Sequence, residues 1–152
     1  MELNVEYASG QYIGIVEPDD FADIFELIKD LWSYNKYDFD KTFDIYKEII
    51  SKTNSFAYVV IDNSEIVGFC HGDFFPTLWM CGKTCYLSGI ITDNRHRNKG
   101  IGKFMLNHVR TVAKESNCKA IILDSGLPRT GAHKFYEKFG FEKSCYGFEM
   151  AI

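Results

Sequence analysis

The sequence is poor in the residues and patterns that mark non-globular chains. Its 152 residues include only 12 glycines and 3 prolines, too few for a collagen-like repeat or a linker array. It lacks an apolar stretch long enough to cross a membrane, a secretory pattern at its start and any internal repeat. With 46% hydrophobic residues, it is expected to form a single cytoplasmic domain over residues 1–152, without a membrane partner.

The 5 cysteines lack a pattern that would indicate disulfides or a metal site. Their number is odd and their spacing is irregular, and no further cysteine or histidine completes a zinc set around Cys81 and Cys85. Free thiols in a reducing compartment are the simpler interpretation, and no metal is expected.

Charge is distributed unevenly along the chain, although the net charge is only −4. Residues 1–80 carry 5 lysines and arginines against 15 aspartates and glutamates, a balance of −10. Residues 81–152 carry 12 against 6, a balance of +6. Such an asymmetry is typical of a protein with two partners of opposite sign, and chance variation of the surface charge explains it as well.

Hydrophobic periodicity predicts an α/β domain with a mixed sheet. Amphipathic patterns predict four helices, over residues 21–32, 43–50, 101–113 and 130–139. Strand-like apolar runs cover residues 12–16, 56–61, 66–75, 84–92 and 120–123, and a final pair of strands is expected over 141–152.

The most informative segment is the basic run from Arg95 to Lys103, between an apolar strand and an amphipathic helix. Its amides would form a helix N-terminus, which binds anions through unpaired N–H groups and the positive end of the helix dipole. Gly100 and Gly102 would let the backbone approach a phosphate closely. Four basic side chains would add positive charge: Arg95, Arg97, Lys99 and Lys103. A solvated basic loop explains the spacing equally well.

Other phosphate and nucleic-acid motifs do not fit this segment. A P-loop would need glycine and serine or threonine where Arg97 and Phe104 stand, and a dinucleotide fingerprint would need glycine where Met105 stands. The basic charge is confined to one loop of an acidic chain, so no nucleic-acid partner is expected.

Two segments resemble the GCN5-related N-acetyltransferase (GNAT) superfamily. Arg97-x-x-Gly100-x-Gly102 after a strand is similar to the acetyl-CoA pyrophosphate loop of that family, Gln/Arg-x-x-Gly-x-Gly/Ala, and residues 132–141 (AHKFYEKFGF) are similar to its late helix. The resemblance covers nearly the whole chain. It implies a mixed, mostly antiparallel sheet of about six or seven strands flanked by about four helices, with acetyl-CoA as co-substrate.

The resemblance also implies roles for individual residues. Backbone groups of Ile90, Ile91 and Thr92 would bind the pantetheine arm as if it were an added strand. The pyrophosphate would be held by the loop and the helix start, comprising Arg97, Asn98, Lys99, Gly100, Ile101, Gly102 and Lys103. Tyr136 matches the position that protonates the leaving CoA thiolate, a transfer that suits the ordinary pKa values of a phenol and a thiol.

Arg129 stands where many family members have asparagine. Its five donors and fixed charge suit a carbonyl, a phosphate oxygen or an anionic substrate group, and it is assigned to cofactor binding. Together with the late helix, Arg129 is similar to the aminoalkylphosphonate acetyltransferase branch, although the early-strand glutamate of that branch is missing here.

The general base is open at this point. Some family members place glutamate in the strand where Ser88 and Gly89 stand, and others place it twelve residues before the catalytic tyrosine, which is Asp124 here. Asp124 also suits a turn. A water relay, Asp73 or His71 would serve instead.

Residues 32–40 are the segment expected to meet the acceptor. Tyr34 and Asp38 would bind a cationic amine through cation–π contact and carboxylate pairing, or would belong to a solvated loop. The sequence therefore predicts an N-acetyltransferase acting on a primary amine, of a small molecule or a peptide, by direct attack in a ternary complex. A homodimer is a further expectation, and a non-catalytic acyl-CoA-binding regulatory module is the alternative.

Overall fold

The structure, a computed structural model, describes residues 4–8 and 10–152, which form two compact units divided after Ile122. The first unit contains, in chain order, β1 (Val5–Ala8), β2 (Gln11–Ile15), α1 (Phe21–Leu31), α2 (Phe39–Ser51), β3 (Ser55–Asp62), β4 (Glu65–Thr77), β5 (Gly82–Thr92), α3 (Ile101–Glu115) and β6 (Cys118–Ile122). The second unit contains α4 (Thr130–Phe139). Among the described residues, no helix combines the length and apolar character that crossing a membrane requires.

The strands of the described residues form one six-stranded sheet in chain order, and neighbours run antiparallel except for β5 and β6. The β3–β4 hairpin closes through Asn63 and Ser64, whose positive φ values of 47° and 71° fit the two-residue turns that match strand twist. Because β5 and β6 are parallel, the chain must cross between their ends, and α3 makes that crossing. The predicted mixed, mostly antiparallel sheet with flanking helices is confirmed.

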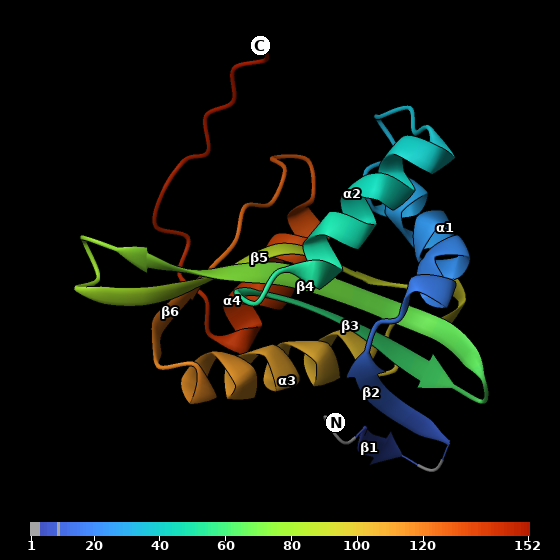
Figure 1. Cartoon of the computed structure of the whole chain (residues 1–152). Coiled ribbons are helices and arrows are strands. Elements are labelled where there is room, and N and C mark those ends of the chain that lie inside the picture. Colours follow the sequence, from blue (N-terminus) through green and yellow to red (C-terminus); the bar gives the residue numbers. More distant parts are fainter. Residues whose placement is uncertain (1–3, 9) are drawn as a thin grey trace. The chain divides into compact units, whose positions relative to one another are not determined.

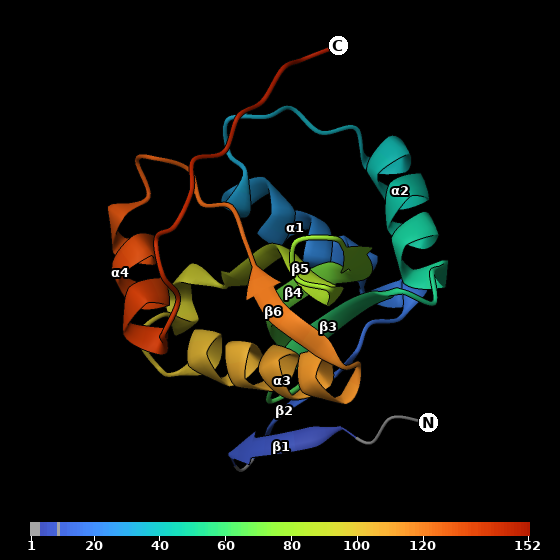
Figure 2. The same ribbon diagram turned by 90° about the vertical axis from the view of Figure 1, so that its left-hand side faces the viewer.

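Helices cover both faces of this sheet, with α1 and α2 on one face and α3 on the other (Figure 1 and Figure 2). The buried side chains of α1 are Phe21, Ile24, Phe25, Leu27 and Ile28. Those of α3 are Ile101, Met105, Leu106, Val109 and Ala113. Both sets follow the helical period of the sequence, and burying each large apolar side chain stabilises the fold by about 1.5–3 kcal/mol.

The expected final pair of strands over residues 141–152 is wrong. Residues 141–152 form neither strand nor helix, and Tyr146, Phe148 and Met150 are 80%, 96% and 83% exposed. Their alternation has the period of a strand, but a strand needs a neighbour to accept and donate its main-chain hydrogen bonds. The second unit contains no strand that could be that neighbour. Conversely, β1 was not predicted, because it has only four residues and all of them are exposed.

The ladder between β4 and β5 is interrupted by a bulge. The register pairs His71 with Gly89 and Gly72 with Leu87, which leaves Ser88 without a partner on β4. A Cβ atom at Gly72 would overlap the main-chain oxygen of Tyr86 and the ring of Phe56. The bulge therefore brings the backbone of β5 so close to β4 that only glycine fits at position 72.

Gly72→Ala should destabilise the protein by about 1–3 kcal/mol, because the Tyr86 carbonyl belongs to the backbone and can retreat only by disturbing the sheet. Gly131→Ala is the matched control, since nothing lies within 4 Å of its added Cβ atom and alanine favours a helix. Urea unfolding followed by circular dichroism measures both variants. A Gly72→Ala variant as stable as the wild type would contradict the overlap.

Candidate functional site

The segment between β5 and α3 has the geometry of an anion-binding loop. Asn98 and Gly100 have positive φ values of 61° and 83°, on either side of Lys99, and alternation of this kind can form a concave nest of N–H groups. Gly100 is the N-cap position of α3. A Cβ atom at Gly100 would lie 2.5 Å from the Tyr7 hydroxyl oxygen, so the position requires glycine for its space as well as for its φ.

Among the described residues, no side chain caps the first turn of α3. Gly100 offers no capping side chain, and the first turn contains no acidic residue. The first helical hydrogen bond that returns to the loop is donated by the Phe104 amide to the Gly100 carbonyl at 2.9 Å. The amides of Ile101, Gly102 and Lys103 are therefore available to donate hydrogen bonds to an anion, which would stabilise the helix N-terminus.

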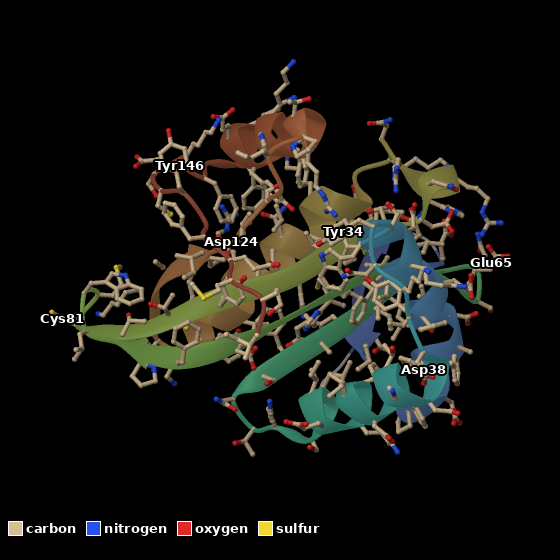
Figure 3. The ribbon with its side chains drawn as sticks, turned by 90° about the horizontal axis from the view of Figure 1, so that it is seen from above. Tyr34, Asp38, Glu65, Cys81, Asp124 and Tyr146 are labelled. Atoms are coloured by element: carbon tan, nitrogen blue, oxygen red, sulfur yellow. The ribbon has the colours of Figure 1, made fainter. Side chains whose placement is uncertain are left out.

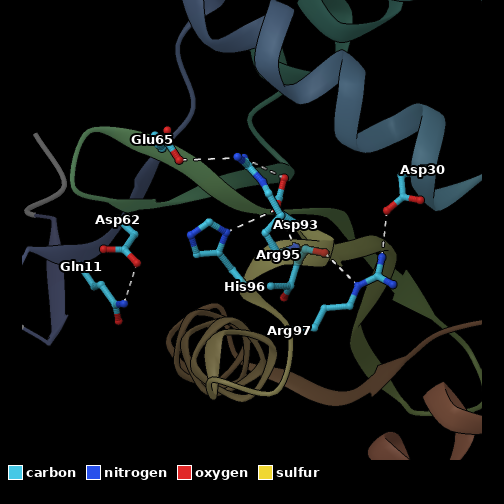
Figure 4. A network of polar contacts seen from close by, with 9 residues as sticks. Gln11, Asp30, Asp62, Glu65, Asp93, Arg95, His96 and Arg97 are labelled. Carbon is cyan, nitrogen blue, oxygen red and sulfur yellow. Dashed lines mark hydrogen bonds and ion pairs between the residues drawn. The ribbon is translucent and has the colours of Figure 1, made fainter.

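Two of the four basic side chains expected around the phosphate have carboxylate partners instead (Figure 4). The Arg95 guanidinium lies 3.1 Å from Asp93 and 3.9 Å from Glu65. Its hydrogen bonds to Asp93 lower the pKa of that carboxyl to about 2. Arg97 donates to the Thr92 carbonyl at 3.3 Å and to a carboxylate oxygen of Asp30 on α1 at 2.8 Å.

The remaining two cations, Lys99 and Lys103, are exposed and form no ion pair with any described residue. Positive charge at the loop therefore comes from these lysines and from main-chain amides. Arg97 fixes the loop to α1 and to the end of β5. Sequence reasoning missed Asp30, because nothing in its exposed helical position distinguishes it from the other acidic residues of the chain.

The strand that leads into this loop has one free edge. β5 pairs with β6 only from Lys83 to Tyr86, while Ile90, Ile91 and Thr92 pair with β4. No described strand pairs with residues 87–92 on the β6 side. Main-chain N–H and C=O groups on such an edge can bind an extended ligand in the manner of an added strand.

The second unit contains Tyr136 and Arg129. The Tyr136 ring contacts Phe135 and Phe141 at centroid distances of 5.5 and 5.8 Å. Burial raises the pKa of Tyr136 above its ordinary value of 10, and the positive charge of Arg129 opposes this effect. The phenol is consequently protonated throughout the neutral range and can act as a proton donor.

The carboxylate of Asp124 also belongs to the second unit. Asp124 is exposed, and its Oδ1 lies 3.3 Å from where a Cβ atom of Gly147 would stand. The turn that follows Asp124 leads to α4, where the Arg129 amide donates to the Gly126 carbonyl and a ring nitrogen of His133 lies 3.0 Å from the same oxygen.

The two residues expected to bind the acceptor lie on the connection between α1 and α2 (Figure 3). Tyr34 is 76% exposed. Asp38 is the N-cap of α2, and its carboxylate accepts a hydrogen bond of 2.9 Å from the Lys41 amide. Asp38 thus has a structural function whatever it binds.

Comparison with known proteins agrees with this fold. The sequence profile of the acetyltransferase (GNAT) family matches residues 21–141. The uncharacterized N-acetyltransferase YhdJ of Bacillus subtilis is 22% identical over 139 residues, which is 91% of this chain and 96% of that protein.

Two solved structures show the same fold. A transcriptional regulator from Bacillus halodurans has a TM-score of 0.85 and 26% identity, covering 92% of this chain and 98% of its own. The aminoglycoside N-acetyltransferase AAC(6')-Iy in complex with CoA has a TM-score of 0.82 and 17% identity, covering 93% and 94%. With a family profile that spans most of its length, this chain belongs to the acetyltransferase (GNAT) family and is an acyltransferase.

Proposed function

We propose that the protein transfers the acetyl group of acetyl-CoA to a primary amine, of a small molecule or a peptide. The amine would attack directly in a ternary complex of protein, acetyl-CoA and amine, and residues 1–152 would act as a single domain. The observation that carries this proposal is the continuity of two features in the first unit. The free edge of β5 leads directly into the uncapped N-terminus of α3. An extended chain that ends in a pyrophosphate is a ligand that would satisfy both.

The cofactor contacts follow from this continuity. Ile90, Ile91 and Thr92 would offer main-chain groups to the amides of the pantetheine arm. The amides from Asn98 to Lys103 would surround the pyrophosphate, and the ammonium groups of Lys99 and Lys103 would add attraction that falls with salt. Arg97 would act by holding the loop in shape, because its guanidinium is already bound to Asp30 and to the Thr92 carbonyl.

The chemistry requires two proton transfers. The amine nitrogen attacks the thioester carbonyl carbon, the C–S bond breaks, and the thiolate takes a proton from the Tyr136 hydroxyl. The raised pKa of Tyr136 keeps that proton in place until the pH exceeds 10, so this group should limit the rate only in strongly alkaline solution. Arg129, whose charge acts on Tyr136, would stabilise the negative charge that develops there.

The amine must lose its own proton to a base. Asp124 is the candidate that the motif spacing offers for this task, and Asp73, His71 and a water relay are the others. The acceptor itself would approach from the side of Tyr34 and Asp38, which belong to the acidic part of the sequence, residues 1–80, and this suits a protonated amine. The resemblance to aminoalkylphosphonate acetyltransferases, which depends on Arg129, stays a prediction.

Tyr136→Phe should lower kcat by about 10²–10⁴-fold, because phenylalanine keeps the ring contacts and removes only the donated proton. Its affinity for acetyl-CoA should stay within about twofold. Release of CoA thiol across a panel of amines measures the rate, and Tyr146→Phe, an exposed tyrosine of the same unit, is the control. An unchanged rate would remove Tyr136 from the mechanism. Tight acetyl-CoA binding by the wild type without turnover of any amine would instead favour the non-catalytic acyl-CoA-binding module.

Gly100→Glu should weaken acetyl-CoA binding at least about tenfold, since it adds bulk against Tyr7 and negative charge at the N-terminus of α3. Asn94→Glu adds the same charge at an exposed position of the same segment outside the helix N-terminus. Titration calorimetry with acetyl-CoA compares the two variants. Equal affinities would place the pyrophosphate elsewhere.

Two substitutions at Asp38 separate its capping role from substrate binding. Asp38→Asn keeps a capping oxygen and removes the charge, so stability should hold while KM for a cationic amine rises. Asp38→Ala should in addition lose about 1 kcal/mol of stability. Steady-state kinetics and thermal unfolding give the two readings. A KM that is unchanged in both variants would restrict Asp38 to its cap.

A further inference from the structure

We infer that His71 on β4 receives the proton that the acceptor amine loses before it attacks the thioester. This inference rests on the acetyl transfer proposed above, and it assigns the general base that the sequence left open among Asp124, Asp73, His71 and a water relay. It depends on where His71 lies along the sheet, on the side chains around its ring and on what its nitrogens can reach.

His71 lies on the strand next to β5, level with the expected position of the thioester. A pantetheine arm that starts at the N-terminus of α3 and follows the free edge of β5 passes Thr92, Ile91 and Ile90 in turn, at about 3.3 Å per residue. The next residues are Gly89 and the bulged Ser88. Gly89 is the direct cross-strand partner of His71, and such partners have side-chain positions about 4.5–5.5 Å apart. The arm follows the edge of β5 that faces away from β4, so the reacting carbonyl would lie across Gly89 from the imidazole, and the acceptor amine or a water would bridge the two.

Two aromatic rings form walls around the imidazole. Phe69 stacks on it at a centroid distance of 5.4 Å, and Trp32 meets it edge to face at 6.3 Å. The same indole covers β5, because a Cβ atom at Gly89 would lie 3.1 Å from Trp32 Cη2. Trp32 thus touches both the histidine and the strand position that the thioester would reach. Its ring offers a surface on which a cationic amine can bind before it is deprotonated.

The ring nitrogens of His71 are available. Neither nitrogen forms a hydrogen bond with any residue that the structure describes. The described residues also contain no side-chain polar atom that is both fully buried and without a partner, so each of these nitrogens keeps some exposed surface. An imidazole whose ring packs against aromatic side chains and whose nitrogens have no hydrogen-bond partner can accept a proton from an amine directly or through one water.

The electrostatic surroundings keep the imidazole unprotonated at neutral pH. Burial lowers the pKa of His71 below its ordinary value of 6.5, and the carboxylate of Asp73 on the same strand partly opposes this shift. The Ser55 hydroxyl donates to Asp73 at 2.5 Å, which holds that carboxylate in place. The neighbours of His71 on the adjoining elements are Ala57 on β3 and Gly89 on β5, its cross-strand partners, and Trp32 at the end of α1, none of which is ionisable.

The proton and electron balance of the step is complete. The protonated amine first gives one N–H proton to His71, which frees the lone pair that forms the new N–C bond. The C–S electron pair leaves on sulfur, which takes the Tyr136 proton, and the second N–H proton of the nitrogen passes to solvent. The products are an amide and CoA thiol, and His71 then releases its proton to solvent as Tyr136 regains one.

His71→Gln tests this assignment through the pH dependence of the rate. At pH 7 the variant should show a kcat/KM for the amine that is about 10²–10⁴-fold lower, with acetyl-CoA affinity unchanged. The deficit should shrink as the pH approaches the pKa of the amine, because a free amine needs no base. In the wild type, kcat/KM should fall as the pH drops through the His71 pKa, below 6.5, and this acidic limb should be missing in the variant. His71→Asn repeats the test with a shorter amide if glutamine disturbs the aromatic contacts.

Two comparisons make the result decisive. His108→Gln removes a histidine from α3, where it packs against Tyr58 on the opposite face of the sheet, and it should keep the wild-type pH profile. Asp124→Asn removes the competing base. If Asp124→Asn abolishes the acidic limb while both His71 variants keep it, the assignment to His71 is overturned and acetyl transfer stands. If the wild type turns over no amine, the proposed function and the role of His71 are overturned together.

Discussion

The early end of the pairing between β5 and β6 is the constraint on which the candidate site depends. The two strands share a parallel ladder only as far as Tyr86, and the rest of β5 pairs, among the described strands, with β4 alone. Main-chain groups without partners are costly unless water or a ligand satisfies them. The bulge at Ser88 adds local twist at the start of this unpaired stretch. This unpaired edge therefore defines a path for an extended ligand along β5, from the N-terminus of α3 to the bulge at Ser88.

Ion pairs between the basic and the acidic part of the sequence partly neutralise its charge asymmetry. Arg95 and Arg97 contribute to the positive balance of residues 81–152, but their partners Glu65 and Asp30 come from the acidic residues 1–80. These pairs are exposed, and exposed pairs contribute little stability by themselves. Their effect is to hold the shape of the loop, which leaves recognition of an anion to amides and to Lys99 and Lys103.

Sequence reasoning predicted the features that depend on neighbours along the chain. The periodic helices and strands, and the junction between β5 and α3, are local patterns of side chains and glycines, and the structure contains them. The prediction of two final strands was wrong because an alternating pattern does not by itself make a strand. A strand also needs a neighbouring strand to pair with, and the sequence of the segment does not specify that neighbour. The pair of Arg97 with Asp30 and the contact of Trp32 with Gly89 join residues far apart in sequence, so no local pattern could predict them.

A cofactor edge made of main-chain groups has an evolutionary consequence. Substitution of the half-buried Ile90 or Thr92 by another residue that favours a strand leaves the N–H and C=O groups of that edge in place, so these side chains can change, whereas Ile91 is held by its place in the core. The glycines cannot change, because at Gly72 and Gly100 an added methyl group meets the Tyr86 carbonyl and the Tyr7 hydroxyl. Relatives as distant as the Bacillus subtilis protein, at 22% identity, can therefore diverge along such a strand while the same backbone surface persists.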